Sequence, residues 1–254
     1  MKVTPKKHLG QHFLLDLTIA EDITKALTFH NNYQTLIEIG PGTGVLTDYL
    51  IQNKEIDFRT VEIDKESVKF LHQKYPDLAV IEGDFLQIDL PKTFPAKIGI
   101  LGNFPYNVAT QIFFQVIDHR DQVEEVVCMV QKEVAVRLCA KPGGRDCGIM
   151  SVLLQPWYDC EYLFTVHENV FDPPPKVKSG VIRVRRNTRT SLGVDEAAYK
   201  KTIKQAFSMR RKTLRNCFKA VGVAADILAL PVFDKRAEAL GVEDFVELTK
   251  LVGL

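Results

Sequence analysis

The sequence has 254 residues, of which 46% are hydrophobic, and its formal net charge is +1. A chain of this length and composition buries a sizeable core, and no apolar run approaches the roughly 18 residues that a membrane span needs. Residues 1–7, MKVTPKK, are not followed by the apolar core of a secretion signal. These features argue against a membrane or secreted protein, and we expect a globular protein of the cytoplasm.

Strand and helix patterns alternate along the first part of the chain, which is typical of a mostly parallel sheet. In chain order we expect a helix at 18–28, a strand at 35–39, a helix at 43–52, a strand at 57–63, a helix at 65–74, strands at 78–82 and 97–101, a helix at 108–118, and strands at 125–130 and 133–140. The fold class is therefore α/β.

The pattern changes after the loop sequence KPGG at 141–144. We expect two or three strands between residues 149 and 166 and one more at 180–186, added in antiparallel orientation. From 195 to 251 the apolar positions fit helices. We therefore expect a sheet domain at 1–189 and a small all-helical C-terminal domain at 190–254.

The first expected strand ends in a glycine-rich turn, LIEIGPGTG at 36–44. Gly40, Gly42 and Gly44 allow a tight turn in which a ligand approaches the main chain without a Cβ in the way. Glu62 stands 22 positions after Gly40, at the end of the next strand. An acid at this separation is placed to accept both hydroxyls of a ribose.

The ligand of this turn is expected to carry a positive charge. The acid Glu38 precedes the first glycine, where it would repel the pyrophosphate of a dinucleotide. Asp84 ends the third strand and is placed to bind an adenine amino group. A nucleoside with a sulfonium and an ammonium group, S-adenosylmethionine, satisfies all of these residues.

The sequence GNFPYN at 102–107 follows an apolar strand, which Pro105 brings to an end. The side-chain oxygen of Asn103 and a backbone carbonyl near Phe104 or Pro105 can accept both hydrogens of a planar amine, and its lone pair then faces a methyl donor. Tyr106 can stack on the base. An adenine N6 amine fits this arrangement, and so does the side-chain amide of a protein glutamine.

The segment from Lys176 to Lys219 contains fourteen Lys and Arg residues against two acids, whereas the chain before about residue 170 is acidic in balance. A helix from about Asp195 would bring Lys200, Lys204, Arg211 and Arg215 close to one face. This charge favours an anionic partner such as a folded RNA.

In combination, these motifs resemble the ribosomal RNA adenine N6-dimethyltransferases of the KsgA (RsmA) type, from Lys7 to about Val252. The segments that carry the resemblance are HLGQHFL at 8–14, the turn at 38–44, VEID at 61–64, GD at 83–84, GNFPYN at 102–107, VFDPPPKVKS at 170–179, RRKTLRN at 210–216 and residues 236–246. Phe104 stands where this family usually has Leu, and we expect the site to tolerate it.

The resemblance implies a Rossmann-like methyltransferase sheet that binds S-adenosylmethionine and dimethylates N6 of two adjacent adenosines in the 3′-terminal hairpin loop of 16S rRNA, within the 30S particle or its precursor. The resemblance further implies that the protein is a monomer, that it needs no metal ion and that DNA is not its substrate. The cofactor residues implied are His12, Leu14, Glu38, Gly40, Gly42, Glu62, Asp84 and Asn103. The residues expected at the target base are Asn103, Pro105, Tyr106 and Phe171, with Phe171 opposite Tyr106. The residues expected to contact RNA are Lys176, Lys178, Arg210, Arg211, Lys212 and Arg215.

Other functions remain open at this stage. A 23S rRNA adenine methyltransferase of the macrolide-resistance type would share the motifs up to about residue 186, although residues 211–214 and 242–245 resemble the small-subunit enzymes. A methyltransferase of DNA adenine or of a protein glutamine fits residues 103–106. A non-catalytic assembly or transcription factor could keep the fold, but the intact site residues argue against it.

Overall fold

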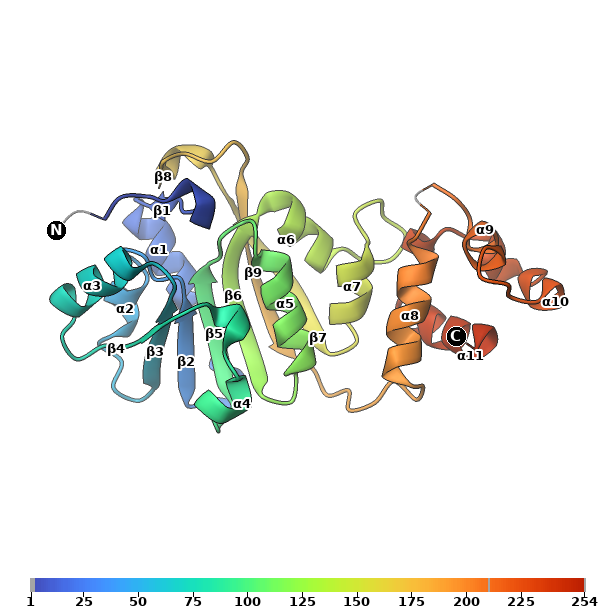
Figure 1. The fold of residues 1–254 in the computed structure, drawn as a ribbon, viewed down its shortest axis with the longest axis horizontal. Helices are drawn as coiled ribbons and strands as arrows, with labels where there is room; N and C mark the ends of the chain where they lie inside the picture. The colour runs from blue at the N-terminus through green and yellow to red at the C-terminus, as the bar shows by residue number, and fades with distance from the viewer. Residues whose placement is uncertain (1–2, 210, 254) are drawn as a thin grey trace. The chain divides into compact units, whose positions relative to one another are not determined.

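The computed structural model describes residues 3–209 and 211–253, and its elements are labelled in Figure 1. The chain forms two compact units. The first contains the chain up to Ala135 together with Asp159–Arg186, and the second contains Val136–Tyr158 and the chain from Asn187 onward. The C-terminal part of the second unit thus begins at Asn187, three residues before the expected boundary at 190. The second unit also contains Val136–Tyr158, which we expected within the sheet domain at 1–189.

The strands are β1 (Phe13–Leu14), β2 (Thr35–Ile39), β3 (Asp57–Glu62), β4 (Ala79–Glu82), β5 (Ile98–Asn103), β6 (Val123–Gln131), β7 (Tyr158–Val166), β8 (Phe171–Asp172) and β9 (Ser179–Arg186). The α-helices are α1 (Leu17–Lys25), α2 (Thr47–Leu50), α3 (Lys65–Lys74), α4 (Leu90–Thr93), α5 (Ala109–Asp118), α6 (Lys132–Cys139), α7 (Ile149–Leu154), α8 (Glu196–Ala206), α9 (Leu214–Lys219), α10 (Ala225–Leu228) and α11 (Val242–Val252). Short 3₁₀ turns are η1 (Lys7–Leu9), η2 (His30–Asn32), η3 (Phe85–Gln87), η4 (Glu168–Val170), η5 (Pro231–Asp234) and η6 (Ala237–Ala239). Within the described part of the chain, no helix has the length and apolar character needed to cross a membrane.

Seven strands form one sheet in the order β4-β3-β2-β5-β6-β9-β7. The pairs among β4, β3, β2, β5 and β6 are parallel, whereas β9 runs antiparallel to β6. The prediction of a mostly parallel sheet with antiparallel additions is confirmed. Because parallel strands end at the same edge, this topology brings the carboxyl ends of β2, β3, β4 and β5 together, and ligands of open α/β sheets bind at such edges.

A glycine at the end of β5 lets this strand lie close to β2. A Cβ on Gly102 would lie 2.6 Å from the carbonyl oxygen of Ile39, a distance that real side chains do not reach. The absence of that Cβ therefore allows Asn103, the next residue, to lie beside the turn that follows Ile39.

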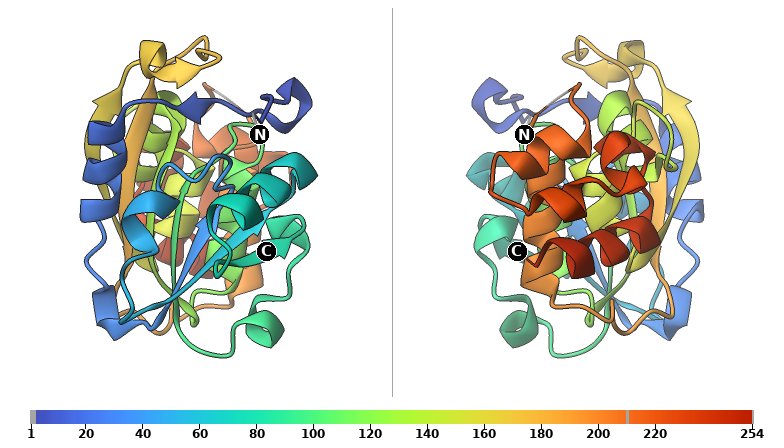
Figure 2. Two further views of the ribbon diagram at one scale, coloured as in Figure 1. Left: turned by 90° about the vertical axis from the view of Figure 1, so that its left-hand side faces the viewer. Right: turned by 90° about the vertical axis from the view of Figure 1, so that its right-hand side faces the viewer.

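Helices cover both faces of this sheet, with α1 behind it and α5 in front of it in the view of Figure 1; Figure 2 shows the same elements from the side. Asp16 caps α1 by accepting hydrogen bonds from the N–H groups of Thr18 and Ile19. Ala20 and Ile23 of α1 are fully buried. This spacing of three residues places one side of α1 on the sheet.

Two of the expected strands are helices. Residues 132–139 form α6 rather than a strand, because the buried positions Ala135 and Leu138 are three apart instead of alternating. Residues 149–154 form α7, and β7 follows only at Tyr158.

The expected helix at 43–52 is reduced to α2, since the glycine turn extends further than expected.

The prediction that one helix face carries Lys200, Lys204, Arg211 and Arg215 is also wrong. Helix α8 ends at Ala206, and Arg211 adopts a left-handed backbone with φ 69°, so Lys200 and Lys204 lie on a different element from Arg215 in α9. The core of the second unit contains an aromatic pair, because the rings of Phe218 and Phe233 meet edge to face with centroids 5.8 Å apart.

Candidate active site

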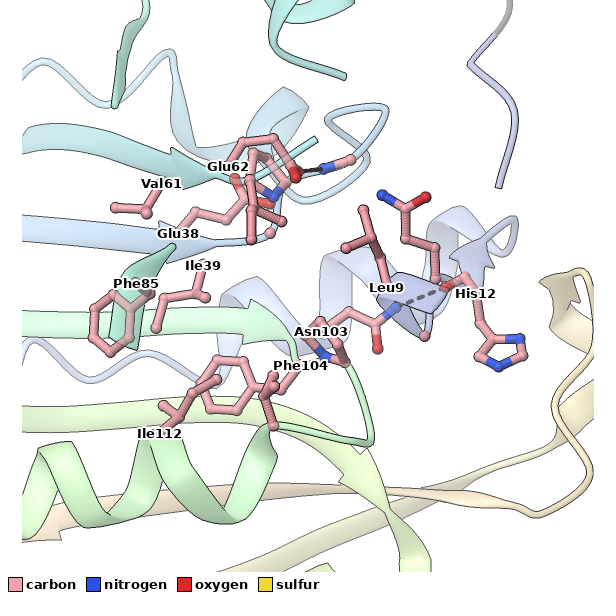
Figure 3. A pocket seen from close by; sticks show the side chains of 18 of the residues that line it. Leu9, His12, Glu38, Ile39, Val61, Glu62, Phe85, Asn103, Phe104 and Ile112 are labelled. Atoms are coloured by element: carbon pink, nitrogen blue, oxygen red, sulfur yellow. Dashed lines mark hydrogen bonds between the residues drawn. The ribbon is translucent and has the colours of Figure 1, made fainter. Parts of the chain in front are cut away.

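One cavity opens at the carboxyl edge of the parallel strands, and Figure 3 shows side chains from β2, β3, β5 and α5 around it. Every residue predicted to bind the cofactor lines this cavity: His12, Leu14, Glu38, Gly40, Gly42, Glu62, Asp84 and Asn103. Sequence positions up to 91 residues apart therefore meet in one place, as in the hydrogen bond between Asn103 and His12.

The glycine turn presents bare backbone to the cavity. Gly40 and Gly42 have φ values of 66° and 57°, which side chains other than glycine rarely adopt. A Cβ on Gly40 would find no atom within 4 Å, so it would project into open space. A Cβ on Gly42 would lie 2.9 Å from the ring of Phe13. The turn thus leaves room for a ligand on one side and for the N-terminal segment on the other.

Glu62 lies at the end of β3 and is buried. Its Oε2 accepts a hydrogen bond from the N–H of Gly42 at 3.0 Å, and its Oε1 accepts one from the N–H of Asp64 at 2.8 Å. Burial raises the pKa of Glu62, while these backbone donors oppose the rise. Each oxygen keeps a second lone pair, so the carboxylate can accept two hydroxyls of one ribose.

Glu38 lies one residue before the end of β2 and is buried. Its Oε2 accepts a hydrogen bond of 2.6 Å from the hydroxyl of Thr47. Burial raises the pKa of Glu38 to about 8, and the neighbouring Glu62 carboxylate adds to this. With this pKa the carboxyl keeps its proton near neutral pH. The expectation that the charge of Glu38 repels phosphates is therefore corrected, because the carboxyl is fully charged only above about pH 8.

Replacing Glu38 with Gln should change how stability depends on pH. The folded-state pKa of about 8 exceeds the ordinary 4.5, so the folded protein binds more protons between these values and loses unfolding free energy as the pH rises through them. Glu38→Gln removes this loss, which we expect to be on the order of a few kcal/mol. Urea unfolding of both proteins from pH 5 to 8 measures the difference, and parallel stability curves would contradict it.

Asp84 follows β4 and lines the same cavity. Its Oδ1 accepts a hydrogen bond from the N–H of Leu86 at 3.0 Å and so caps the turn η3. This contact fixes the side chain and leaves its second oxygen for an amino group. Ile63 and Phe85, which sequence reasoning missed, also line the cavity.

The N-terminal segment crosses the cavity and is held at several points. Lys6 forms an ion pair with Asp64, and the Nε2 of Gln11 donates a hydrogen bond to Asp64 at 3.4 Å. Desolvation raises the pKa of Asp64, but the hydrogen bonds from Lys6 and its other donors together lower it. Beyond this anchor, β1 pairs with β8 through Leu14 and Phe171. Sequence reasoning missed this role of Asp64, which also caps α3.

Asn103 is oriented by the same segment. Its Nδ2 donates a hydrogen bond of 3.0 Å to the carbonyl oxygen of His12, drawn as a dashed line in Figure 3. A carbonyl only accepts, so the amide nitrogen faces His12 and Oδ1 is left for another donor. Of the two expected carbonyls, that of Pro105 already accepts from the N–H groups of Val108 and Ala109. The carbonyl of Phe104 is therefore the better candidate for a second acceptor.

The two expected aromatic residues lie in different surroundings. Tyr106 lines the cavity, and its hydroxyl forms a hydrogen bond of 2.6 Å with that of Ser179. Burial raises the pKa of this tyrosine. Phe171 is 3% exposed and belongs to a hydrophobic cluster with Leu14 and Ile23 instead of lining the cavity. Its place opposite Tyr106 stays a prediction.

The expected RNA contacts are divided between the two units. Lys176 and Lys178 are exposed in the first unit, and Arg211 and Lys212 are exposed in the second. Arg215 forms an ion pair of 2.7 Å with Asp234. Arg210 lies outside the described residues. Contact of these residues with RNA stays a prediction.

The cavity combines carboxylates, bare backbone and an oriented amide. Over residues 3–209 and 211–253, no group of three or more His, Cys, Asp or Glu side chains could hold a metal ion. The carboxylates and the bare backbone suit a nucleoside, and the amide of Asn103 suits the hydrogens of a planar amine. Held together, the nucleoside and the amine would be positioned for group transfer.

Sequence comparison finds the same family over almost the whole chain. Residues 3–251 match the model of the family described as "Ribosomal RNA adenine dimethylase". The "Ribosomal RNA small subunit methyltransferase A" of Cytophaga hutchinsonii is 55% identical over 253 residues, covering 99% of this chain and 98% of the relative. The protein of the same name from Parabacteroides distasonis is 54% identical, covering 97% and 93%.

Solved structures share the fold. A dimethyladenosine transferase from Plasmodium falciparum aligns with a TM-score of 0.77 and 26% identity, covering 93% of this chain and 96% of its own. The 23S rRNA methyltransferase ErmE aligns with a TM-score of 0.71 and 21% identity, covering 95% of this chain and 100% of its own, and it shows the fold alone.

Proposed function

Because this chain belongs to the ribosomal RNA adenine dimethylase family, we propose that it transfers methyl groups from S-adenosylmethionine to N6 of two adjacent adenosines in the 3′-terminal hairpin loop of 16S rRNA. The chain is an rRNA adenine dimethyltransferase, and the particular nucleotides and the 30S particle as substrate are the proposal. The observation that carries it is the free Oδ1 of Asn103 in the same cavity as Glu62 and the glycine turn.

The residues present fit the cofactor. Gly40 leaves open space where a Cβ would stand, and the two oxygens of Glu62 are held in place by backbone donors with lone pairs to spare. Asp84 would bind the adenine amino group. Glu38 would face the positively charged end, since a cation favours its ionised form. S-adenosylmethionine supplies an electrophilic methyl carbon on a positively charged sulfur.

The protein's part in the transfer is to position and activate the acceptor amine. Oδ1 of Asn103 and the carbonyl of Phe104 would accept its two hydrogens, which lets the nitrogen become pyramidal and directs its lone pair outward. Tyr106 would stack on the base. Once methylated, the nitrogen is cationic and its proton is acidic enough to pass to water. No strong base is needed, and alignment supplies most of the rate.

The target adenine must leave its helix or loop to enter the cavity, as for other enzymes that act on bases. The exposed cations of the two units would track the RNA backbone. We further propose that the protein acts as a cytoplasmic monomer.

A methyl-transfer assay tests the proposal. Donor carrying a labelled methyl group is incubated with unmodified 30S particles, 50S precursors, DNA or a release factor, and the modified nucleoside is identified by mass. We expect N6,N6-dimethyladenosine in the 30S particle. Transfer to 50S precursors would support the 23S alternative instead, and transfer only to DNA or protein would overturn the proposal.

Charge reversal tests the RNA surface. Arg211→Glu with Lys212→Glu should weaken binding of the 30S particle about tenfold near 0.1 M salt and lower the salt dependence of binding, because each cation releases condensed counterions. Filter binding over a salt series measures both. The matched control reverses Lys69 and Lys92, which are exposed in the first unit. Equal effects in the two double variants would show that residues 211–212 do not contact RNA.

A further inference from the structure

One face of the Tyr106 ring is already covered. The ring of His12 stacks on it with centroids 5.5 Å apart and an interplanar angle of 29°. These are the distance and the near-parallel geometry of an aromatic pair. In the proposed function, a stacked arrangement of this kind is the one that the target adenine takes on Tyr106.

Tyr106 has little freedom to avoid this neighbour. Its hydroxyl forms the hydrogen bond with Ser179, which is fully buried in β9. The ring is thus fixed at its far end by a strand of the central sheet. If a base is to occupy the covered face, the group that moves is His12.

His12 is held by contacts of two kinds. Its backbone carbonyl accepts the hydrogen bond from Asn103, and its ring Nδ1 lies 2.6 Å from the carbonyl of Pro173. Since a carbonyl only accepts, Nδ1 donates. A rotation of the side chain breaks the ring contacts and keeps the backbone contact, so the ring can leave Tyr106 without releasing the amide of Asn103.

We propose that His12 is a positioning residue whose ring covers the base-binding face of Tyr106 in the free protein and is displaced by the target adenine. This inference rests on the proposed function. Pro173 lies three residues before Lys176, one of the expected RNA contacts, so the segment expected to meet the RNA also carries the carbonyl that holds the ring. The stack would keep the apolar face of Tyr106 covered until the substrate arrives.

NMR tests the free state. The chain has six histidines, and comparison with a His12→Asn variant identifies the ring signals of His12. We expect these signals to carry an upfield ring-current shift that disappears in a Tyr106→Leu variant. Unchanged His12 signals in Tyr106→Leu would overturn the proposal, because the ring would then not lie on Tyr106 in solution.

Kinetics test the displacement with two matched variants. His12→Phe keeps a ring and loses the hydrogen bond to Pro173, whereas His12→Asn keeps a hydrogen-bonding group and loses the ring. At saturating cofactor, we expect His12→Asn to lower the KM for unmodified 30S particles about fivefold, which corresponds to about 1 kcal/mol. His12→Phe, which keeps a ring over Tyr106, should lower the KM less. Equal KM values for the two variants would overturn the proposal.

The outcomes separate this inference from the proposed function. If the wild-type protein methylates 30S particles but the two variants do not differ, the inference fails and the proposed function stands. If the wild-type protein transfers no methyl group to 30S particles, the proposed function fails, and the inference fails with it.

Discussion

Replacing Asn103 with alanine should lower kcat for methyl transfer about 10²- to 10³-fold, the range found when one oriented hydrogen-bond partner of a reacting group is removed. The affinity for the cofactor should change only a few-fold. The reason is the geometry of the side chain: Nδ2 is used by the carbonyl of His12, and Oδ1 is left for the amine. Single-turnover assays on 30S particles give the rate, and calorimetry with S-adenosylhomocysteine gives the affinity.

Two controls sharpen this experiment. Asn103→Asp keeps the shape and one acceptor oxygen but places a second oxygen against the His12 carbonyl, so it should lose most of the rate as well. Thr110→Ala changes an exposed residue at the start of α5 and should leave the rate unchanged. Equal loss of rate and cofactor affinity in Asn103→Ala would show that Asn103 serves mainly to hold the cofactor.

The site could be predicted from the sequence because its residues stand at the ends of parallel strands. Glu38, Glu62, Asp84 and Asn103 each lie within two residues of the end of a strand, and the sheet brings these ends to one edge. A glycine or proline beside an apolar strand marks both the strand end and the functional residue at Glu38, Asp84 and Asn103, whereas Glu62 is marked by its separation from Gly40. No long-range information was needed to group them.

Features that depend on tertiary contacts were not predictable. The strand expected at 133–140 is a helix, since only packing decides between two readings of a short apolar run. The raised pKa of Glu38 follows from its burial beside Glu62. The anchor formed by Lys6 and Asp64 joins residues 58 apart, and nothing near either residue indicates the other. The sequence pattern places Arg211 and Arg215 on the helix that begins near Asp195, but in the structure that helix ends at Ala206.

Replacing Glu62 with glutamine should weaken binding of S-adenosylhomocysteine about 100-fold, or roughly 2.7 kcal/mol. Both carboxylate oxygens accept backbone N–H groups, from Gly42 and from Asp64. A glutamine has one oxygen, so its NH₂ group must face one of these donors, which disturbs the glycine turn and removes an acceptor for a ribose hydroxyl. The effect therefore combines a lost ligand contact with a displaced backbone.

The neighbouring strand supplies the matched control for this substitution. Glu82 is the partner of Glu62 in the register of β3 and β4, but it is exposed and lies outside the cavity. Glu82→Gln should leave the Kd unchanged, so the same chemical change one strand away separates the site from the sheet edge in general. Thermal unfolding of both variants checks that the fold persists, and Glu62→Asp, which keeps two oxygens, should recover part of the affinity. Equal affinities for Glu62→Gln and Glu82→Gln would mean that the cofactor ribose is held elsewhere.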